Sequence, residues 1–474
     1  MRVGVRMTWG ANIFDYDNAF QVGPNHWQVN CSSNGIFLML TSLCEEIVVD
    51  APWKGERAER IIVDLTPDHV SGIMECFIEE FSNTWHPGEY QGSFNECLAS
   101  VEQEFQNWLA ATPEVPSEYA DARELAAYIN WSSVVAPEGN FTRSAMYMSK
   151  NWMTGLWTWD HCFNAMALAY HNPSLAWDQL MIPFEYQTTD GASPDRIDDK
   201  HLIWNFCKPP IHGWVLKWMM GHSDVITSAH LRGVYEPFSR WTHWWFNYRD
   251  LDQDGIPEYH HGNDASWDNA TTFEAGLPLE GPDLASFLVI QMEALGEIAG
   301  RIGKKSASNE WWNKDENLLE KLLAHSWRGD HFIAPRSGDH RHFESQSLFL
   351  YLPLILGHRL PKDISTALIQ GLTQPGRFIT NYDLATESPS IPLYQPDGYW
   401  RGPIWAPSTL IIVSGLADCG EKQLARDLSQ KFCSMASRSG MAENFNALTG
   451  EGLRDPDYPW TSSVFLILAH EYLQ

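Results

Sequence analysis

The sequence is poor in basic residues. It has 32 Lys and Arg against 60 Asp and Glu, which gives a formal net charge of −28 at pH 7. Proteins that bind nucleic acid use clustered basic side chains to replace the counterions of the phosphate backbone, and binding to an anionic membrane surface makes a similar demand. The longest apolar run, around residues 348–356, is too short to span a bilayer. We therefore expect no nucleic-acid partner and no membrane partner.

Several enzyme signatures are also missing. The chain contains no Gly-x-Ser-x-Gly, His-Glu-x-x-His, Walker or Gly-x-Gly-x-x-Gly motif. These absences argue against a serine hydrolase, a zinc protease and a nucleotide-dependent enzyme, so we expect no required cofactor. The eight cysteines are scattered and never form Cys-x-x-Cys, and residues 1–6 lack the apolar run of a signal peptide. We expect reduced thiols and a cytoplasmic protein.

Tryptophan, by contrast, is abundant, with 23 residues. Flat aromatic faces stack on the apolar faces of sugar rings and on cations. A single Trp more often packs between helices than binds a ligand. The tryptophans therefore indicate carbohydrate binding only where polar side chains accompany them.

Periodicity divides the chain in two. In residues 1–95, β-branched and aromatic runs predict short strands at 35–40, 46–49, 60–65 and 73–77. From residue 96 onward helical patterns dominate. The clearest helix is 283–302, and the next is 308–327 with Ser308 as its expected N-cap. We predict a mainly α fold, with a small β-rich region at 1–95 and a helical domain at 96–474. Roughly a dozen helices would close into a toroid whose loops form a pocket at one end.

Four loop segments combine aromatic and polar side chains. They are residues 155–163, 262–274, 399–405 and 443–446. Taken singly, Asp160 fits a helix N-cap, Asp268 a turn and Glu443 a solvated charge. Taken together, Asp268 and Glu443 suit glycoside hydrolysis, in which one carboxyl group acts as acid and the other as base.

These segments resemble glycoside hydrolase family sixty-three and, more loosely, the trehalases of its clan. The matching stretches occur in the family's order: Trp157-Thr158-Trp159-Asp160 with Phe163, Pro209 to Trp214, Trp267-Asp268-Asn269, Tyr399 to Trp405, and Glu443-Asn444-Phe445-Asn446 through Gly450 to Trp460. The resemblance implies an (α/α)6 barrel and inverting hydrolysis of α-glycosides, with Asp268 as general acid and Glu443 as general base. The family often has Glu-Ser-Gly where this chain has Asp264-Ala265-Ser266, so no role is carried over to Asp264.

The same resemblance implies a set of substrate-binding residues, most of them aromatic. They are Trp157, Trp159, Asp160, Phe163, His212, Trp214, Trp267, Trp400, Arg401, Trp405 and Trp460. On this interpretation the indole rings would stack on sugar rings, and the polar groups would bind hydroxyls.

An acidic segment precedes the proposed acid. Asp250, Asp252 and Asp254 occupy the first, third and fifth positions of a calcium-loop pattern, but His261 stands where an EF-hand has its bidentate Glu. The segment is therefore no EF-hand. Some members of the family carry calcium in a comparable loop, so the alternatives are a structural calcium site and a plain solvated turn.

The main functional prediction is an inverting α-glucosidase that acts on a small oligosaccharide or glycoside; the oligomeric state is left open. One alternative is a hydrolase of glucosylglycerate or mannosylglycerate. The carboxylate of such a substrate calls for a cation, for which Arg196, Lys208 and Arg454 are candidates. An alternative of another class is a non-catalytic carbohydrate-binding toroid, which would not need the Asp268 and Glu443 pair.

Overall fold

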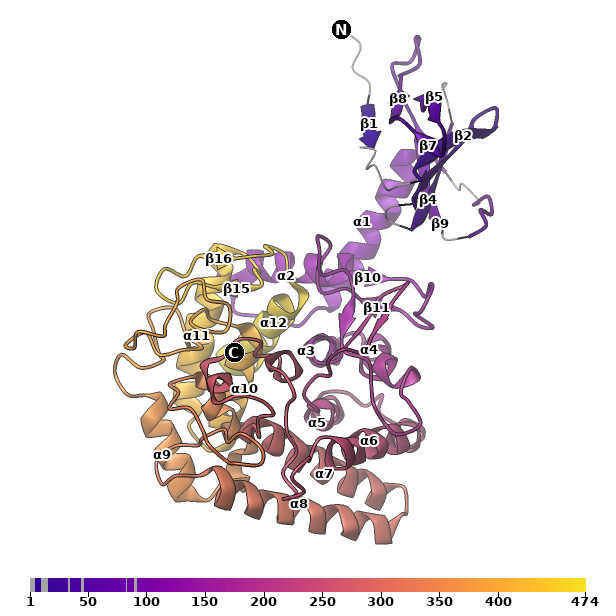
Figure 1. Ribbon diagram of the computed structural model, residues 1–474. Helices are drawn as coiled ribbons and strands as arrows, with labels where there is room; N and C mark the ends of the chain where they lie inside the picture. Colours follow the sequence, from indigo (N-terminus) through magenta and orange to yellow (C-terminus); the bar gives the residue numbers. More distant parts are fainter. Residues whose placement is uncertain (1–4, 10–15, 33–34, 44–46, 82, 89–91) are drawn as a thin grey trace. The chain divides into compact units, whose positions relative to one another are not determined.

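The computed structural model describes residues 5–9, 16–32, 35–43, 47–81, 83–88 and 92–474. The chain forms two compact units, Met1–Glu104 and Phe105–Gln474. The division falls inside helix α1 (Phe94–Ala111), whereas the sequence placed it after residue 95 (Figure 1).

The first unit is built from antiparallel β-sheets. One sheet has the order β1-β8-β5, a second has the order β2-β3-β4-β9, and β6 pairs with β7. In β8, Ile61, Val63 and Leu65 are buried, because alternate side chains of a strand point to the same face. The predicted strands at 35–40, 46–49 and 60–65 are confirmed as β4, β5 and β8, whereas the strand predicted at 73–77 begins only at Cys76, as β9. The strand bounds are β1 Val5–Trp9, β2 Asn18–Gly23, β3 His26–Cys31, β4 Ile36–Ser42, β5 Ile47–Asp50, β6 Trp53–Lys54, β7 Arg57–Ala58, β8 Ile61–Leu65 and β9 Cys76–Phe81.

The second unit is mainly helical (Figure 1). Its longer helices are α2 Ala120–Ser132, α3 Asp160–Leu168, α4 Pro173–Glu185, α5 His212–His222, α6 Ser228–Tyr248, α7 Pro282–Arg301, α8 Lys305–Ser326, α9 Lys362–Leu372, α10 Ala406–Asp418, α11 Lys422–Ser439 and α12 Pro459–Leu473, together with the 3-10 helix η5 Leu348–Arg359. Shorter 3-10 helices are η2 Ser117–Tyr119, η3 Gly262–Ala265 and η4 Thr271–Ala275. Two-residue strands are β10 Val134–Val135, β11 Ala145–Met146, β12 Leu156–Trp157, β13 Arg196–Ile197, β14 Leu202–Ile203, β15 Asn444–Phe445 and β16 Gly452–Leu453.

Six of these elements form a closed ring of contacts. In order they are α3, α5, α7, η5, α10 and α12; each contacts the next, and α12 contacts α3 again. Helices α2, α4, α6, α8, α9 and α11 each pack on one or more members of this ring. The ring helices are the apolar ones. Every residue of α3 is buried, and so are most residues of α7, α10 and α12.

Helix α7 shows how local sequence determines one ring element. Pro282 occupies its first turn, where a missing N–H costs nothing, and the three-and-four spacing of its apolar residues is confirmed as a helix. The predicted N-cap of the next helix is wrong. Helix α8 begins at Lys305, so Ser308 lies inside it, and the Ser308 hydroxyl donates a hydrogen bond to the carbonyl oxygen of Gly296 at 2.8 Å.

Two further observations concern the class of protein. None of the helices in the described residues combines the length and the apolar character of a membrane span. None of the seven cysteines in the described residues is in a disulfide bond; they are Cys31, Cys76, Cys97, Cys162, Cys207, Cys419 and Cys433.

Candidate active site

A cavity of about 70 Å³ lies in the helical unit where several segments remote in sequence meet. Most of them lie at or just before the N-termini of ring helices: Asp160 opens α3, Tyr399 and Trp400 precede α10, and Tyr458 and Trp460 flank the start of α12. The residues that line the cavity are Met153, Trp157, Asp160, Lys208, Asn263, Ser266, Asp268, Tyr399, Trp400, Tyr458 and Trp460.

Asp268 is held in a loop that is bonded to the Trp400 segment. The neighbouring side chain, Asn269, accepts a hydrogen bond at Oδ1 from the Trp400 backbone N–H at 3.0 Å, and its Nδ2 donates to the Gly398 carbonyl at 3.0 Å. Arg401 Nε donates to the Asn269 carbonyl at 2.6 Å. The loop that carries Asp268 and the aromatic wall beside it are therefore fixed to each other.

A chain of polar contacts also holds the Asp268 carboxylate itself. Asn263 Nδ2 donates to Asp268 Oδ1 at 2.9 Å. The Lys208 ammonium donates to the Asn263 carbonyl at 2.8 Å and to Asn263 Oδ1, and it forms an ion pair with Asp195 Oδ1 at 2.7 Å. An ammonium group has three donors, and Asn263 accepts from two of them. Lys208 therefore orients Asn263 and, through it, Asp268.

Asp160 is the first residue of α3 and is only 5% exposed. Burial raises the pKa of the Asp160 carboxyl to about 7, although the positive charge of Lys208 opposes this shift. Burial also raises the pKa of Asp195. Asp160 and Asp195 thus lie near the buried ammonium of Lys208, and burial favours the protonated form of both carboxyl groups.

Glu443 lies just before β15 and is 5% exposed. Its backbone N–H donates to the Asp455 carbonyl at 2.7 Å, and Trp460 Nε1 donates to the Glu443 carbonyl at 3.3 Å. Burial raises the pKa of the Glu443 carboxyl to about 7; Arg454 opposes this effect, and the negative charge of Asp268 adds to it. Glu443 also acts electrostatically on Tyr399 and Tyr458 of the cavity wall. The two predicted carboxyl groups are therefore neighbours.

Tryptophans form a layered wall next to Asp268. Trp400 lines the cavity and stacks on Trp405, with ring centroids 4.1 Å apart and planes 5° apart. Trp267 packs against Trp400 at 4.6 Å. Trp267 and Trp405 are 1% and 0% exposed. Although the sequence placed them at the substrate, they lie behind the wall and hold Trp400 in place.

Four other predicted substrate contacts lie in or against the core. Trp159 and Phe163 are buried and meet edge to face at 5.3 Å, Phe163 contacts the partly buried Trp214 at 6.4 Å, and His212 is fully buried. The reason is that α3 is an inner helix, so only its first residue, Asp160, reaches the cavity. Of the predicted residues, the cavity is lined by Trp157, Asp160, Asp268, Trp400 and Trp460.

Arg401 braces the Asp268 loop from the side. Besides its bond to Asn269, the Arg401 side chain donates from Nη2 to Glu274 Oε1 at 2.5 Å. The sequence analysis had predicted a substrate contact for Arg401.

The sequence analysis also overlooked five residues of the cavity wall: Met153, Asn263, Ser266, Tyr399 and Tyr458. Among the overlooked residues, Ser266 and Tyr399 have left-handed backbones, with φ of 55° and 63°. The spacing of apolar residues predicts helices and strands, so it could not predict these two loop residues.

The three candidate cations occupy different places. Lys208 lines the cavity, and its ammonium is engaged by Asn263 and Asp195. Arg196 lies over the Trp157 ring at 4.9 Å and pairs with Asp198 at 2.8 Å. Arg454 lies over the Tyr399 ring at 4.9 Å, and its Nη1 donates to Asp397 and Asn444. Arg454 is thus the cation that adjoins both the cavity wall and Glu443.

Comparison with known proteins identifies the family. The family profile of the mannosylglycerate hydrolase MGH1-like glycoside hydrolase domain matches residues 153–461, which include every residue of the cavity wall. The chain belongs to this family. It is therefore a glycoside hydrolase, and the resemblance to glycoside hydrolase family sixty-three is confirmed.

Two curated relatives act on glycerate glycosides. The hydrolase is 22% identical over 408 residues to the glucosylglycerate hydrolase of Mycolicibacterium hassiacum, an alignment that covers 66% of this chain and 91% of that protein. It is 28% identical over 116 residues to the mannosylglycerate hydrolase of Thermus thermophilus, which covers 24% of this chain and 28% of that protein.

Solved structures share the fold. A GH63 mannosylglycerate hydrolase of Thermus thermophilus, in complex with Tris and D-glycerate, aligns with a TM-score of 0.65 at 17% identity and covers 72% of this chain and 98% of that one. The neutral trehalase Nth1 of Saccharomyces cerevisiae aligns with a TM-score of 0.54 at 13% identity, over 74% of this chain and 80% of that one.

The hydrolase also has the acidic loop that the sequence indicated. Asp250, Asp252 and Asp254 each bring one carboxylate oxygen to within 4.8 Å of the others. Asp250 Oδ2 accepts from the Gly255 N–H at 3.1 Å, whereas Asp250 Oδ1 is buried and has no hydrogen-bond partner in the described residues. An oxygen-rich cluster with an unpaired buried carboxylate oxygen is chemically suited to Ca²⁺.

Proposed function

We propose that this hydrolase cleaves the α-glycosidic bond of a glycerate glycoside, glucosylglycerate or mannosylglycerate, with inversion at the anomeric carbon. The curated relatives favour this alternative over a general α-glucosidase. The observation that carries the proposal is the small cavity with Asp268 in its wall, Glu443 beside it, and an indole face next to both.

The proposed acid is Asp268, which would protonate the glycosidic oxygen. The contacts that run from Asp195 through Lys208 and Asn263 fix the position of one carboxylate oxygen, and the other oxygen can then face the scissile bond. Fixing the acid in this way lowers the entropy cost of reaching the transition state.

The proposed base is Glu443, which would remove a proton from the attacking water. Inverting enzymes keep their two carboxyl groups roughly 6.5–9.5 Å apart so that a water molecule fits between the base and the sugar. The raised pKa of Glu443, about 7, gives its carboxylate the basicity that this step requires.

We propose Arg454 as the cation that binds the glycerate carboxylate. Only its Nη1 forms hydrogen bonds within the described residues, so Nη2 and Nε are available for a second partner. A guanidinium group binds a carboxylate with two parallel hydrogen bonds. Replacing Arg454 by Met should then raise KM for glucosylglycerate much more than KM for a neutral α-glucoside.

The architecture supports the same assignment. We infer an (α/α)6 barrel, in which the closed ring of six elements forms the inner layer and the helices packed on it form the outer layer. In such a barrel the loops at one end of the inner layer surround the active site, and this matches the position of the cavity at the N-termini of α3, α10 and α12.

We further propose a structural Ca²⁺ at Asp250, Asp252 and Asp254. The ion would order the loop after α6 and, further along the chain, the segment that leads to Asp268; it takes no part in the reaction. Addition of CaCl₂ should raise the melting temperature of the wild type, and Asp250→Asn should abolish that increase. As a matched control, Asp330→Asn removes a carboxylate that is 84% exposed and should leave the increase intact.

The function is tested by proton NMR of the sugar released from glucosylglycerate and mannosylglycerate, with trehalose, kojibiose and nigerose for comparison. We expect the enzyme to hydrolyse a glycerate glycoside and to release the β-anomer of the sugar first. Initial α-anomer would overturn inversion. Turnover of the disaccharides alone would overturn the substrate assignment and restore the general α-glucosidase. Binding of sugar without turnover of any substrate would overturn the assignments of Asp268 and Glu443.

A further inference from the structure

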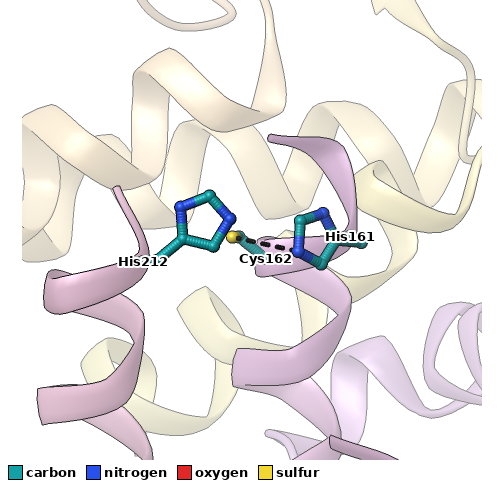
Figure 2. A group of neighbouring side chains, drawn as sticks. All are labelled: His161, Cys162 and His212. Atoms are coloured by element: carbon teal, nitrogen blue, oxygen red, sulfur yellow. Dashed lines mark hydrogen bonds between the residues drawn. The ribbon is translucent and has the colours of Figure 1, made fainter. Parts of the chain in front are cut away.

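Three potential metal ligands meet in the core, away from the acidic loop. His161 and Cys162 are the second and third residues of α3, and His212 is the first residue of α5. All three are fully buried, and Figure 2 shows the sulfur atom between the two imidazole rings. One ligand atom from each residue lies within 4.8 Å of the others, and Cys162 Sγ is 3.6 Å from His161 Nε2.

The orientation of His161 suits a ligand. Its Nδ1 lies 2.7 Å from the Trp157 carbonyl oxygen. A carbonyl can only accept, so Nδ1 carries the proton and Nε2 presents a lone pair toward Cys162. Histidines that bind metals usually donate their other ring N–H to a backbone carbonyl or a carboxylate in this manner.

His212 supplies the second, independent observation. Neither of its ring nitrogens has a hydrogen-bond partner in the part of the chain that the structure describes, and Phe184 and Phe238 pack against the ring at 5.1 and 6.0 Å. Leaving a buried polar group unpaired costs about 1–3 kcal/mol. A metal ion between His212 and Cys162 would satisfy one of these nitrogens.

We propose that His161, Cys162 and His212 bind one thiophilic metal ion, either Zn²⁺ or Cu⁺. A thiolate with two imidazoles favours these ions over Ca²⁺ or Mg²⁺. With Zn–S of about 2.3 Å and Zn–N of about 2.0–2.1 Å, tetrahedral geometry places sulfur and nitrogen about 3.5 Å apart, close to the separation seen here. Binding converts the thiol to a thiolate, and its proton is released to solvent.

The position of this site explains what the ion would do. It would join the N-terminus of α3 to that of α5 behind the cavity. Helix α3 begins with Asp160, and Lys208 lies four residues before His212, so each tied segment delivers one residue to the cavity wall. The ligands are shielded from solvent, so the ion is structural and takes no part in the hydrolysis.

The test is the metal content of the full-length chain. Protein is purified from cells grown with added zinc or added copper, treated with EDTA to remove loosely held ions, and analysed by mass spectrometry. We expect one ion per chain, and the identity of the ion separates Zn²⁺ from Cu⁺. Cys162→Ala and His212→Leu should lose the ion, whereas Cys433→Ala, which changes another fully buried cysteine, should keep it.

Cobalt provides a second readout, which can be measured on the wild-type protein. Wild-type protein refolded with Co²⁺ should show a thiolate-to-cobalt charge-transfer band, which Cys162→Ala lacks. Metal-free wild-type protein from both cultures, together with no band after refolding, would overturn the proposal. So would an ion retained by Cys162→Ala, because that ion would lie elsewhere, for example at Asp254, Glu280, His325 and His340. If the variants fail to fold, the wild-type stoichiometry and the band decide.

Discussion

Removing the charge of Arg454 tests whether Glu443 is the base. Burial raises the pKa of Glu443 to about 7, and Arg454 is the positive charge that opposes this effect. Arg454→Met should therefore raise the pKa further. Opposite charges a few ångströms apart shift a carboxyl pKa by about 1–3 units, and the Arg454 side chain is 28% exposed, so the lower end of that range applies.

The sign of the effect follows from the role of Glu443. A base must be ionised, so kcat/KM of the wild type should rise with pH through about 7 and level off above it. In Arg454→Met the rise should occur about one pH unit higher, so that kcat/KM at pH 6, taken as a fraction of each protein's plateau, is about tenfold lower than in the wild type. The two profiles should have the same shape.

The assay uses an α-glycosyl fluoride, which has no carboxylate and so excludes the proposed contact between Arg454 and glycerate. Arg454→Lys is the control, because it keeps the charge. Arg454 has a left-handed backbone with φ of 64°, and Lys and Met experience the same strain there. A rise that stays at the wild-type pH in Arg454→Met would refute the reasoning. Activity that falls as pH increases through 7 would make Glu443 a proton donor.

Three further outcomes are expected. Asp268→Asn should lower kcat for glucosylglycerate about 10²–10⁴-fold but affect a glycosyl fluoride far less, since fluoride leaves without a proton; an equal loss on both substrates would exclude Asp268 as the acid. Lys208→Met should lower the free energy of unfolding in urea by about 3–5 kcal/mol, because Asp195 stays buried without a partner, and adding Asp195→Asn should restore part of it. Gly262→Ala should lower kcat about 10²-fold, because its Cβ would lie 2.1 Å from the Asp268 carbonyl oxygen, whereas Gly233→Ala, with open space around it, should keep full activity.

The sequence identified the segments of the site more reliably than the residues in it. Trp159 and Asp160 are neighbours, yet only Asp160 lines the cavity, because the next turns of α3 are buried on all sides. Likewise, Trp400 faces the cavity, and Trp405 stacks behind it. A motif shows that such side chains gather at a loop, but it contains no period from which their orientation can be predicted.

No local sequence pattern predicts the contacts that hold Asp268. Asp195, Lys208 and Asn263 come from three separate segments, and they meet only because the ring of helices brings those segments together. The helices themselves were predictable. Apolar spacing identified α7 to within one residue at each end, because the buried face of a long helix repeats with a fixed period.

The balance of charge at the cavity suits the proposed chemistry. Asp160 and Asp195 lie near the buried ammonium of Lys208, and Glu443 lies near Asp268 and Arg454. Hydrolysis of a glycoside passes through a transition state with positive charge on the sugar ring. Ionised carboxyl groups beside the sugar stabilise that positive charge. Without the charge, burial holds the pKa of Asp160 and of Glu443 near 7. A developing cation on the sugar supplies the missing counter-charge, so the site favours the transition state over the free sugar.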